Sequence, residues 1–397
     1  MPELRHRRMP RSKTAQPSCN QRPGLPCPSH AEPSASWRLC WLAVVAVGTD
    51  IVKASLESTS RSSRCARHPA YVPAVVVITT YPGEYDRWHR RLPFGEGLPF
   101  PAGSGGTPLG WNARLRILGV VTGMGPRSAT ATITALGHDP RFDLTSAYWL
   151  LAGIAGFDPA RACVGSAVWA QHLVDGDAAK FIDPREAPRT WPTGWMPLDR
   201  STPFGRLHSK EEAEGMVYSL DPELVGWAFN LTHEVRLPDS AGLRSAREPF
   251  VATLPAASSG PTVLLGATLS TNRIWEGHLS TTWARSWTSY WTLGEGVFVA
   301  SLMEDMGVAL ALSGLERAGL ARGPESGLLV LRTASNFVEP PPGESPADYM
   351  MGTGGVDITS GVFESALEAA FLVGSPVAVA LAGQSPLATP QPIVLVS

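Results

Sequence analysis

The sequence predicts an α/β fold with a largely parallel or mixed sheet. Apolar segments rich in β-branched residues have the length of buried strands, and they lie near residues 75, 117, 147, 163, 263 and 328. Helical segments separate most of them, which is the alternation typical of α/β proteins. Glycine or polar residues follow several of these strands. Since ligands bind at strand ends in such sheets, we expect one site built from many segments.

The composition describes a globular protein. The chain has 397 residues, 44% of them hydrophobic and 17% charged, with a net charge of -2, so it has no electrostatic reason to bind nucleic acid. Its five cysteines suggest neither a disulfide framework nor a metal site, because four of them precede the first strand: Cys19, Cys27, Cys40 and Cys65. We expect no metal and no cofactor. No run of about 18 apolar residues occurs, so we also expect no integral membrane span.

Residues 1–70 differ from the rest and are expected to be an N-terminal extension, with one domain over 71–397. The extension is rich in Arg, Pro and Ser, and its apolar run at 39–47 is followed by small residues near 52–54. This pattern is compatible with a signal peptide, which would make the protein exported or periplasmic. A disordered tail or an over-extended start of translation explains the same residues and leaves the protein cytoplasmic.

The first strand, at 73–80, leads into a turn that carries two carboxylates, Glu84 and Asp86. Helix capping and a functional role are both compatible with carboxylates in this position. After the second strand, Gly123 and Gly125 open a helix, whose free N-terminal amides can hold an anion or a ligand oxygen.

The central stretch, 148–159, is an apolar run that stops at Gly153 and Gly156 and exposes bare backbone at the edge of the sheet. A further strand is expected at 162–170. The strand at 261–268 is followed by Asn272 and by Trp275, which is placed to stack on a planar ligand. Three later tryptophans recur every fourth residue and predict a buried helical face: Trp283, Trp287 and Trp291.

Residues 297–321 are expected to form one helix, and the acidic pair Glu304–Asp305 interrupts its otherwise apolar surface. A buried carboxylate pair requires partners, and a ligand hydroxyl is one such partner. The last core strand, 327–338, carries polar groups at its end: Arg332, Ser335 and Asn336.

In order and spacing, several of these motifs are similar to the nucleoside phosphorylase and nucleosidase superfamily, and more closely to the purine nucleoside permease family of fungi and bacteria. The resemblance covers residues 72–385. It rests on Gly123-Met124-Gly125, Ala152-Gly153-Ile154-Ala155-Gly156, Asp183-x-Arg185-Glu186, Met303-Glu304-Asp305 and Leu331-Arg332-Thr333-Ala334-Ser335-Asn336-Phe337.

The resemblance implies a three-layer αβα sandwich around a mixed sheet that curls towards a barrel, with a purine nucleoside bound at the strand ends. It assigns the ribose hydroxyls to Met303 and Glu304, and it puts Gly123, Gly153, Arg332 and Ser335 in the same site. Asn336 takes the place of a residue that hydrogen-bonds the purine near N7. Glu84 takes the place of a glutamate that activates water. Assembly into a homo-oligomer remains open.

Two departures from that family pattern bear on the reaction. Relatives that use phosphate carry an Arg before the Gly-x-x-Gly strand end and a Ser within it, where this chain has Leu151 and Ile154. Without these donors phosphate would be poorly held. We therefore expect hydrolysis through an oxocarbenium-like transition state, with water oriented by Glu84 and the leaving base stabilised by Asn336.

Two alternatives remain at the level of sequence. The protein is a nucleoside-binding component of uptake that works with a separate membrane protein and cleaves nothing, or it is a degenerate relative with a structural role or an unknown ligand.

Overall fold

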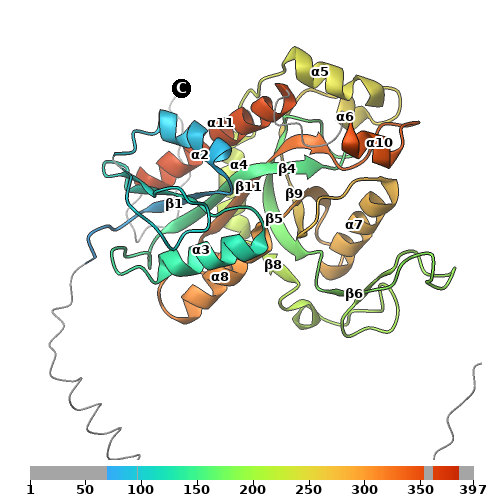
Figure 1. Cartoon of the computed structure of the whole chain (residues 1–397), viewed down its shortest axis with the longest axis horizontal. Helices are drawn as coiled ribbons and strands as arrows, with labels where there is room; N and C mark the ends of the chain where they lie inside the picture. The colour runs from blue at the N-terminus through green and yellow to red at the C-terminus, as the bar shows by residue number, and fades with distance from the viewer. Residues whose placement is uncertain (1–68, 96, 353–360, 384–397) are drawn as a thin grey trace, which may run out of the picture. The chain divides into compact units, whose positions relative to one another are not determined.

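The computed structural model describes residues 69–95, 97–352 and 361–383 (Figure 1). The expected N-terminal extension lies outside the described residues, apart from positions 69 and 70. The division into an extension and one domain, and both expected locations, therefore stay predictions.

A mixed sheet forms the centre of the protein, with strand order β10-β9-β5-β11-β4-β1-β3-β2 and β8 paired to β5. β10 pairs with β9 and also with β4, which closes β4, β11, β5, β9 and β10 into a ring. The predicted mixed, partly barrel-like sheet is therefore confirmed. The strands are β1 (Val75–Thr79), β2 (Gly110–Asn112), β3 (Ile117–Val121), β4 (Tyr148–Phe157), β5 (Ala167–Asp175), β6 (Ala179–Phe181), β7 (Trp195–Pro197), β8 (Val217–Ser219), β9 (Val263–Ser270), β10 (Phe298–Leu302) and β11 (Leu328–Phe337).

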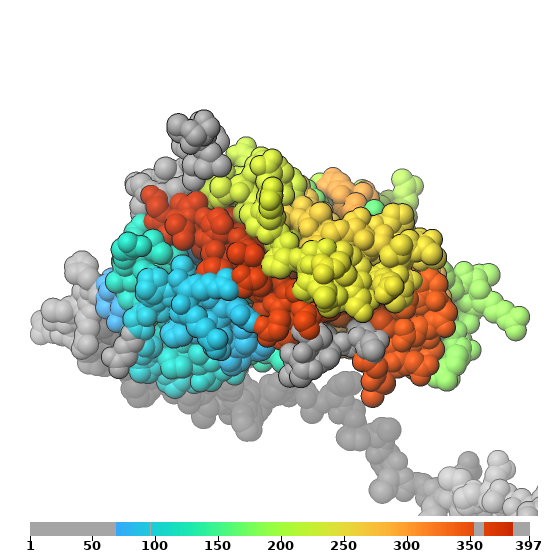
Figure 2. All heavy atoms as spheres, turned by 90° about the horizontal axis from the view of Figure 1, so that it is seen from above, coloured from blue at the N-terminus to red at the C-terminus, as the bar shows by residue number. Residues whose placement is uncertain are grey.

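Helices cover both faces of the sheet and give the predicted three layers (Figure 1). α3 and α8 pack together on one face, while α11 lies across β11 and β4 on the other, between α2 and the pair α4 and α5 (Figure 2). The helices are α2 (Pro82–Arg91), α3 (Pro126–Gly137), α4 (Pro222–Thr232), α5 (Ala241–Arg247), α6 (Pro255–Ser258), α7 (His278–Trp291), α8 (Asp305–Arg317), α9 (Pro324–Gly327), α10 (Pro346–Met351) and α11 (Gly361–Gly383), with short 3₁₀ turns at Glu211–Ala213 and Glu248–Phe250.

α11 is long and apolar enough to cross a bilayer by length and composition. However, 56% of its most apolar window is buried inside the protein, where the helix packs on β11 and β4. Packing on the sheet explains why the helix is apolar. The absence of an integral span stays a prediction.

Two of the expected elements are wrong in type or position. Residues 297–321 do not form one helix, because Phe298–Leu302 is strand β10 and the helix begins at Asp305. A short apolar run is compatible with a strand or a helix. Here the residues form a strand because they pair with β9 and β4. The strand expected at 162–170 begins only at Ala167 and runs to Asp175. Gly165, with φ of +83°, makes the preceding residues a turn.

The expected tryptophan face is confirmed. Trp283, Trp287 and Trp291 are buried on α7, where Trp287 contacts both of the others. α4 begins at Pro222, and the side chain of Asp221 caps it by accepting from the backbone N–H groups of Glu223 and Leu224.

Candidate functional site

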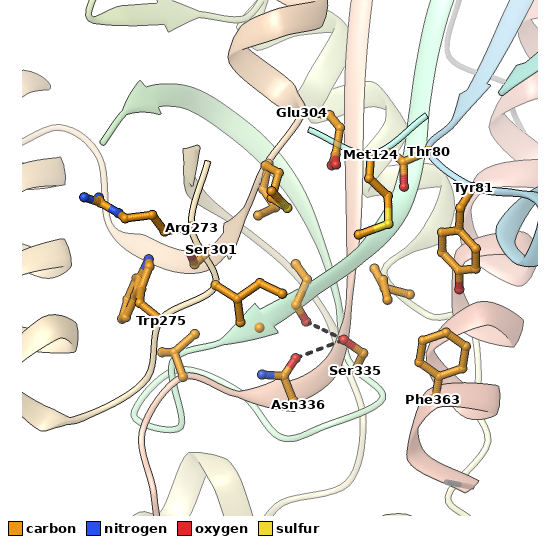
Figure 3. A pocket seen from close by; sticks show the side chains of 17 residues that line it. Thr80, Tyr81, Met124, Arg273, Trp275, Ser301, Glu304, Ser335, Asn336 and Phe363 are labelled. Atoms are coloured by element: carbon orange, nitrogen blue, oxygen red, sulfur yellow. Dashed lines mark hydrogen bonds between the residues drawn. The ribbon is translucent and has the colours of Figure 1, made fainter. Parts of the chain in front are cut away.

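A cavity of about 220 Å³ lies at the ends of β4, β10 and β11 (Figure 3). Its wall also includes the end of β1, the turn before α3, the loop after β9 and the first turn of α11. The residues that line it are Thr80, Tyr81, Met124, Ile154, Ala155, Gly156, Arg273, Ile274, Trp275, Ser301, Leu302, Met303, Glu304, Ser335, Asn336, Val338 and Phe363.

The structure brings half of the sequence-predicted site residues onto this wall: Trp275, Met303, Glu304, Ser335 and Asn336. The others do not line the cavity: Glu84, Gly123, Gly153, Asn272 and Arg332. Gly123 forms the turn after β3 with φ of +78°, and Asn272 has its carboxamide oxygen against Gly125.

Glu304 supplies a buried carboxylate to the cavity. Its side chain is only about 5% exposed, and it lies between β10 and α8. Oε1 accepts a hydrogen bond of 2.9 Å from the backbone N–H of Gly125, and Oε2 accepts one of 3.3 Å from Nη2 of Arg332. These donors hold a negative charge next to the cavity, where it can accept hydrogen bonds from ligand hydroxyls.

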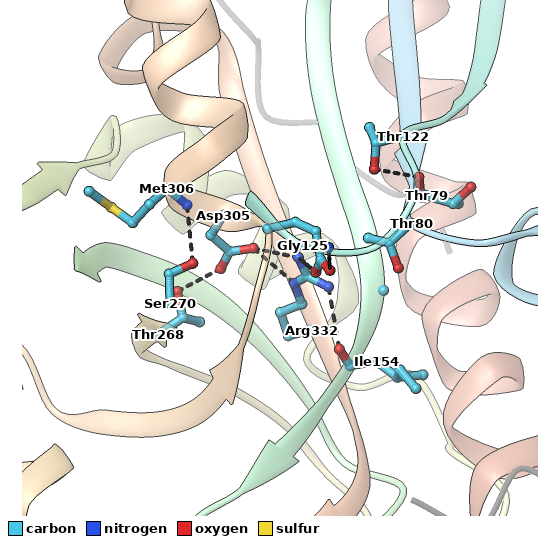
Figure 4. A network of polar contacts seen from close by, with 12 residues as sticks. Thr79, Thr80, Thr122, Gly125, Ile154, Thr268, Ser270, Asp305, Met306 and Arg332 are labelled. Atoms are coloured by element: carbon cyan, nitrogen blue, oxygen red, sulfur yellow. Dashed lines mark hydrogen bonds and ion pairs between the residues drawn. The ribbon is translucent and has the colours of Figure 1, made fainter. Parts of the chain in front are cut away.

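Arg332 is the centre of a polar network behind the wall (Figure 4). Nε and Nη2 donate to Oδ1 of Asp305 at 2.9 and 2.6 Å, and Nη1 donates to the carbonyl of Ile154 at 3.3 Å. Asp305 in turn accepts from the hydroxyl of Thr268 at 2.7 Å. The guanidinium thus donates four hydrogen bonds inside the protein, and it orders carboxylates rather than facing the cavity.

Glu84 lies behind the cavity, in the first turn of α2, and is 3% exposed. Its Oε2 accepts from the backbone N–H and the hydroxyl of Thr80, at 2.7 and 2.9 Å. Its Oε1 accepts from the backbone N–H of Ile154 at 2.8 Å. Burial raises the pKa of this carboxyl above its usual range, and the positive charge of Arg332 opposes that effect.

Gly153 has a packing role in this arrangement. A Cβ atom there would lie 2.5 Å from Nη1 of Arg332 and 2.8 Å from Oε1 of Glu84, which is too close for either contact. The glycine therefore leaves space for the two charged groups behind the wall.

A second polar group lies across the cavity from Glu304, as Figure 3 shows for Asn336 and Ser335. Asn336 accepts a hydrogen bond from the hydroxyl of Ser335 at 3.0 Å, and its Nδ2 donates to the carbonyl of Phe337 at 3.1 Å. The same Nδ2 makes a long contact of 3.5 Å with Oε1 of Glu276.

Glu276 was not predicted as a site residue, because it approaches Asn336 only through the fold. Its Oε2 is buried and has no hydrogen-bond partner among the residues that the structure describes. Burial raises the pKa of this carboxyl from 4.5 to about 7; the hydrogen bond from Asn336 lowers it, and Glu344 raises it further. Glu276 therefore titrates near neutral pH, beside the amide that faces the cavity.

Aromatic side chains form two walls of the cavity. Trp275 stacks on Phe298 with ring centroids 6.2 Å apart. On another side, Tyr81 packs against Phe363 at 6.1 Å. Tyr81 and Phe363 were not predicted, because Phe363 comes from α11 and meets the other residues only through tertiary packing.

Arg273 lies at the rim and is held away from the centre. Its guanidinium stacks over the ring of Trp195 at 4.1 Å and pairs with Asp177 at 3.1 Å. Within the described ranges, no group of three or more His, Cys, Asp or Glu side chains is arranged to hold a metal ion.

Comparisons with known proteins agree with this geometry at the level of family. The family model described as purine nucleoside permease matches residues 72–384. A purine nucleoside permease of Candida albicans is 25% identical over 315 residues, covering 77% of this chain and 74% of that protein. A protein of Schizosaccharomyces pombe, named a probable purine nucleoside permease, is 28% identical over 233 residues, covering 57% and 66%.

Solved structures with a similar chain path include two enzymes of Helicobacter pylori. A 5′-methylthioadenosine/S-adenosylhomocysteine nucleosidase matches with a TM-score of 0.46 and 14% identity, over 77% of this chain and 97% of that one. A futalosine hydrolase matches with a TM-score of 0.44 and 12% identity, over 77% and 98%. The family match covers most of the chain, and on that ground the protein belongs to the purine nucleoside permease family.

Proposed function

We propose that the cavity binds a purine nucleoside and that the protein hydrolyses its N-glycosidic bond. The observation that carries the proposal is the arrangement of polar groups in an otherwise apolar cavity. The carboxylate of Glu304 lies on one side, and the amide of Asn336, with Glu276 behind it, lies on the other. A nucleoside has the same division, with a diol at one end and a base with ring nitrogens at the other. The names of the relatives point to the same ligand.

At the sugar end, Glu304 would accept hydrogen bonds from the ribose hydroxyls, and Met303 would pack against the ring. An oxocarbenium-like transition state carries positive charge on the sugar, so a fixed carboxylate nearby would stabilise it.

At the base end, Trp275 would contact the purine face. Asn336 would donate to the purine near N7 as the leaving base gains electron density. The long contact to Glu276 is the hydrogen bond that such a base nitrogen would replace. Glu276 holds a proton over part of the neutral range, so it could supply that proton to the leaving base.

Water is the favoured nucleophile because the described part of the cavity wall offers no free cation for phosphate. Arg332 already donates four hydrogen bonds, to Asp305, Glu304 and the carbonyl of Ile154, and it lies behind the wall. Arg273 is held at the rim by Asp177 and Trp195. Phosphate would therefore lack the charge-assisted donors that bind it well, and water oriented by Glu84 would replace it.

The test is to incubate the purified protein with adenosine, inosine and guanosine, with and without inorganic phosphate. We expect free base and free ribose at a rate that phosphate does not change. Formation of ribose 1-phosphate would refute hydrolysis, and release of no base from any nucleoside would refute catalysis. Glu304→Gln should lose nucleoside affinity, whereas Glu295→Gln, on an exposed carboxylate paired with Lys210, should not.

A second candidate is binding without cleavage, which the word permease in the relatives' names favours. In that case the protein would capture nucleosides for uptake together with a separate membrane protein. Tight binding by calorimetry, with the nucleoside recovered intact after long incubation, would support this function and exclude the hydrolase.

A further inference from the structure

We propose that Thr80 is a catalytic residue, whose hydroxyl carries a proton from the attacking water to Glu84. The inference rests on the proposed hydrolase function and extends it. It arises from a mismatch in the site: the carboxylate expected to activate water does not line the cavity, whereas Thr80 does.

Thr80 connects the Glu84 carboxylate to the cavity. It follows β1 directly, is about 4% exposed, and lies on the cavity wall (Figure 3). Its Oγ1 donates to Oε2 of Glu84 at 2.9 Å. Among the described residues, it is the one whose side chain hydrogen-bonds Glu84, since the other donors are the backbone N–H groups of Thr80 and Ile154.

This geometry fixes the direction of the relay. Because the hydroxyl proton points at Glu84, the lone pairs of Oγ1 remain free to accept a proton from a water in the cavity. The backbone of Thr80 is anchored by its own N–H bond to Glu84, and Ile154 holds the other carboxylate oxygen. Donor and acceptor are therefore in place before a ligand arrives, which removes the cost of arranging them.

In the reaction, the water oxygen forms a bond to C1′ while the bond from C1′ to the purine nitrogen breaks. The electron pair of that bond goes to the purine, which takes a proton from Glu276, and solvent then returns a proton to Glu276. The water gives one proton to Oγ1 of Thr80 as Thr80 passes its own proton to Oε2 of Glu84. Glu84 ends as a neutral acid and returns the proton to solvent, so the net change is nucleoside and water to ribose and base.

Helix capping explains only part of this arrangement. Glu84 is the third residue of α2, and a glutamate there commonly reaches back to a backbone N–H that precedes the helix. Capping accounts at most for a backbone bond of Glu84, which here goes to the N–H of Thr80, one residue before the N-cap Tyr81. It does not require the hydroxyl bond, nor the bond across the sheet edge to Ile154.

The test compares Thr80→Val, which keeps the shape and removes the hydroxyl, with Thr80→Ser, which keeps the hydroxyl. We expect the valine variant to lose roughly 100-fold in kcat, as for loss of general-base assistance, with unchanged nucleoside affinity by calorimetry. The serine variant should stay within a few-fold of the native protein. Glu84→Gln in the valine background should add little, because both changes break the same relay.

A valine variant with native kcat would overturn the relay, as would additive losses in the double variant. If the native protein releases no base, the hydrolase function itself fails, which is a different result. A proton inventory on the native protein needs no variant. Two protons moving together predict a curved dependence of kcat on the deuterium fraction, and a linear dependence, which indicates one moving proton, or no dependence contradicts the proposal.

Discussion

Glu276→Gln should make the protein more resistant to unfolding at pH 8 than the native chain, while the two should differ little at pH 5. Gln has the same shape and can still accept from Nδ2 of Asn336, but it carries no titratable proton. The comparison therefore isolates the effect of forcing a charge onto a buried carboxyl whose Oε2 has no partner in the described part of the chain.

The sign and size of the change in the free energy of unfolding follow from the pKa of Glu276. The pKa of Glu276 is raised from 4.5 to about 7, so the folded chain holds its proton while the unfolded chain releases it. The free energy of unfolding is therefore unaffected below pH 4.5, falls as the pH rises towards 7, and stays lower above it. Each unit by which the pKa differs between the folded and the unfolded chain is worth about 1.4 kcal/mol. The full effect is about 3.5 kcal/mol, and we expect about 1–2 kcal/mol because solvent around a partly buried group screens its charge.

The assay is urea unfolding of both chains at pH 5, 6, 7 and 8. The advantage of Glu276→Gln should grow with pH and level off above 7. Glu295→Gln serves as the control, because the pKa of that exposed carboxyl is lowered by Lys210 and its loss should give no such gain. An advantage of Glu276→Gln that does not change with pH would refute the reasoning, since the carboxyl would then titrate normally.

Two further predictions concern the scaffold. Arg332→Met should destabilise the protein by about 3–5 kcal/mol, measured by urea unfolding, because it leaves the buried Asp305 carboxylate without its partner; a loss below 1 kcal/mol would contradict the network. Gly307→Ala should also destabilise, since its Cβ would lie 2.3 Å from the carbonyl oxygen of Pro126 where α8 meets α3. Gly314→Ala on the same helix should instead stabilise by roughly 0.5–1 kcal/mol, because no atom lies closer than 4.0 Å to that Cβ; equal effects of the two would show that the close approach does not matter.

The sequence predicted the strands that carry their own local signal. β1, β4, β9 and β11 are runs of apolar, often β-branched residues with clear boundaries, so their burial on both faces is visible in the pattern. β10 lacked such a signal. Its apolar residues run into the helix after Glu304, and the closure of the ring, which no local pattern encodes, makes it a strand.

The residues near the candidate site also include some that the sequence predicted and one that it did not. The order of the motifs along the chain predicted Met303, Glu304 and Asn336 as site residues, and the structure brings them together on the cavity wall. Glu276 was missed because a glutamate beside a tryptophan is ordinary in sequence, and only the approach of β11 buries it. That these residues bind a nucleoside stays a prediction.

The same buried network connects the glycine strand end to the proposed chemistry. The sequence suggested that Gly153 offers its backbone to a ligand, but the glycine leaves room for Arg332 and Glu84 behind the wall. Keeping these charges out of the cavity has a consequence for reactivity. A carboxylate in contact with bulk water would have an ordinary pKa, whereas burial raises that of Glu84 and makes it a stronger base. In the proposed relay, the hydroxyl of Thr80 connects Glu84 to the cavity, from which burial separates the carboxylate.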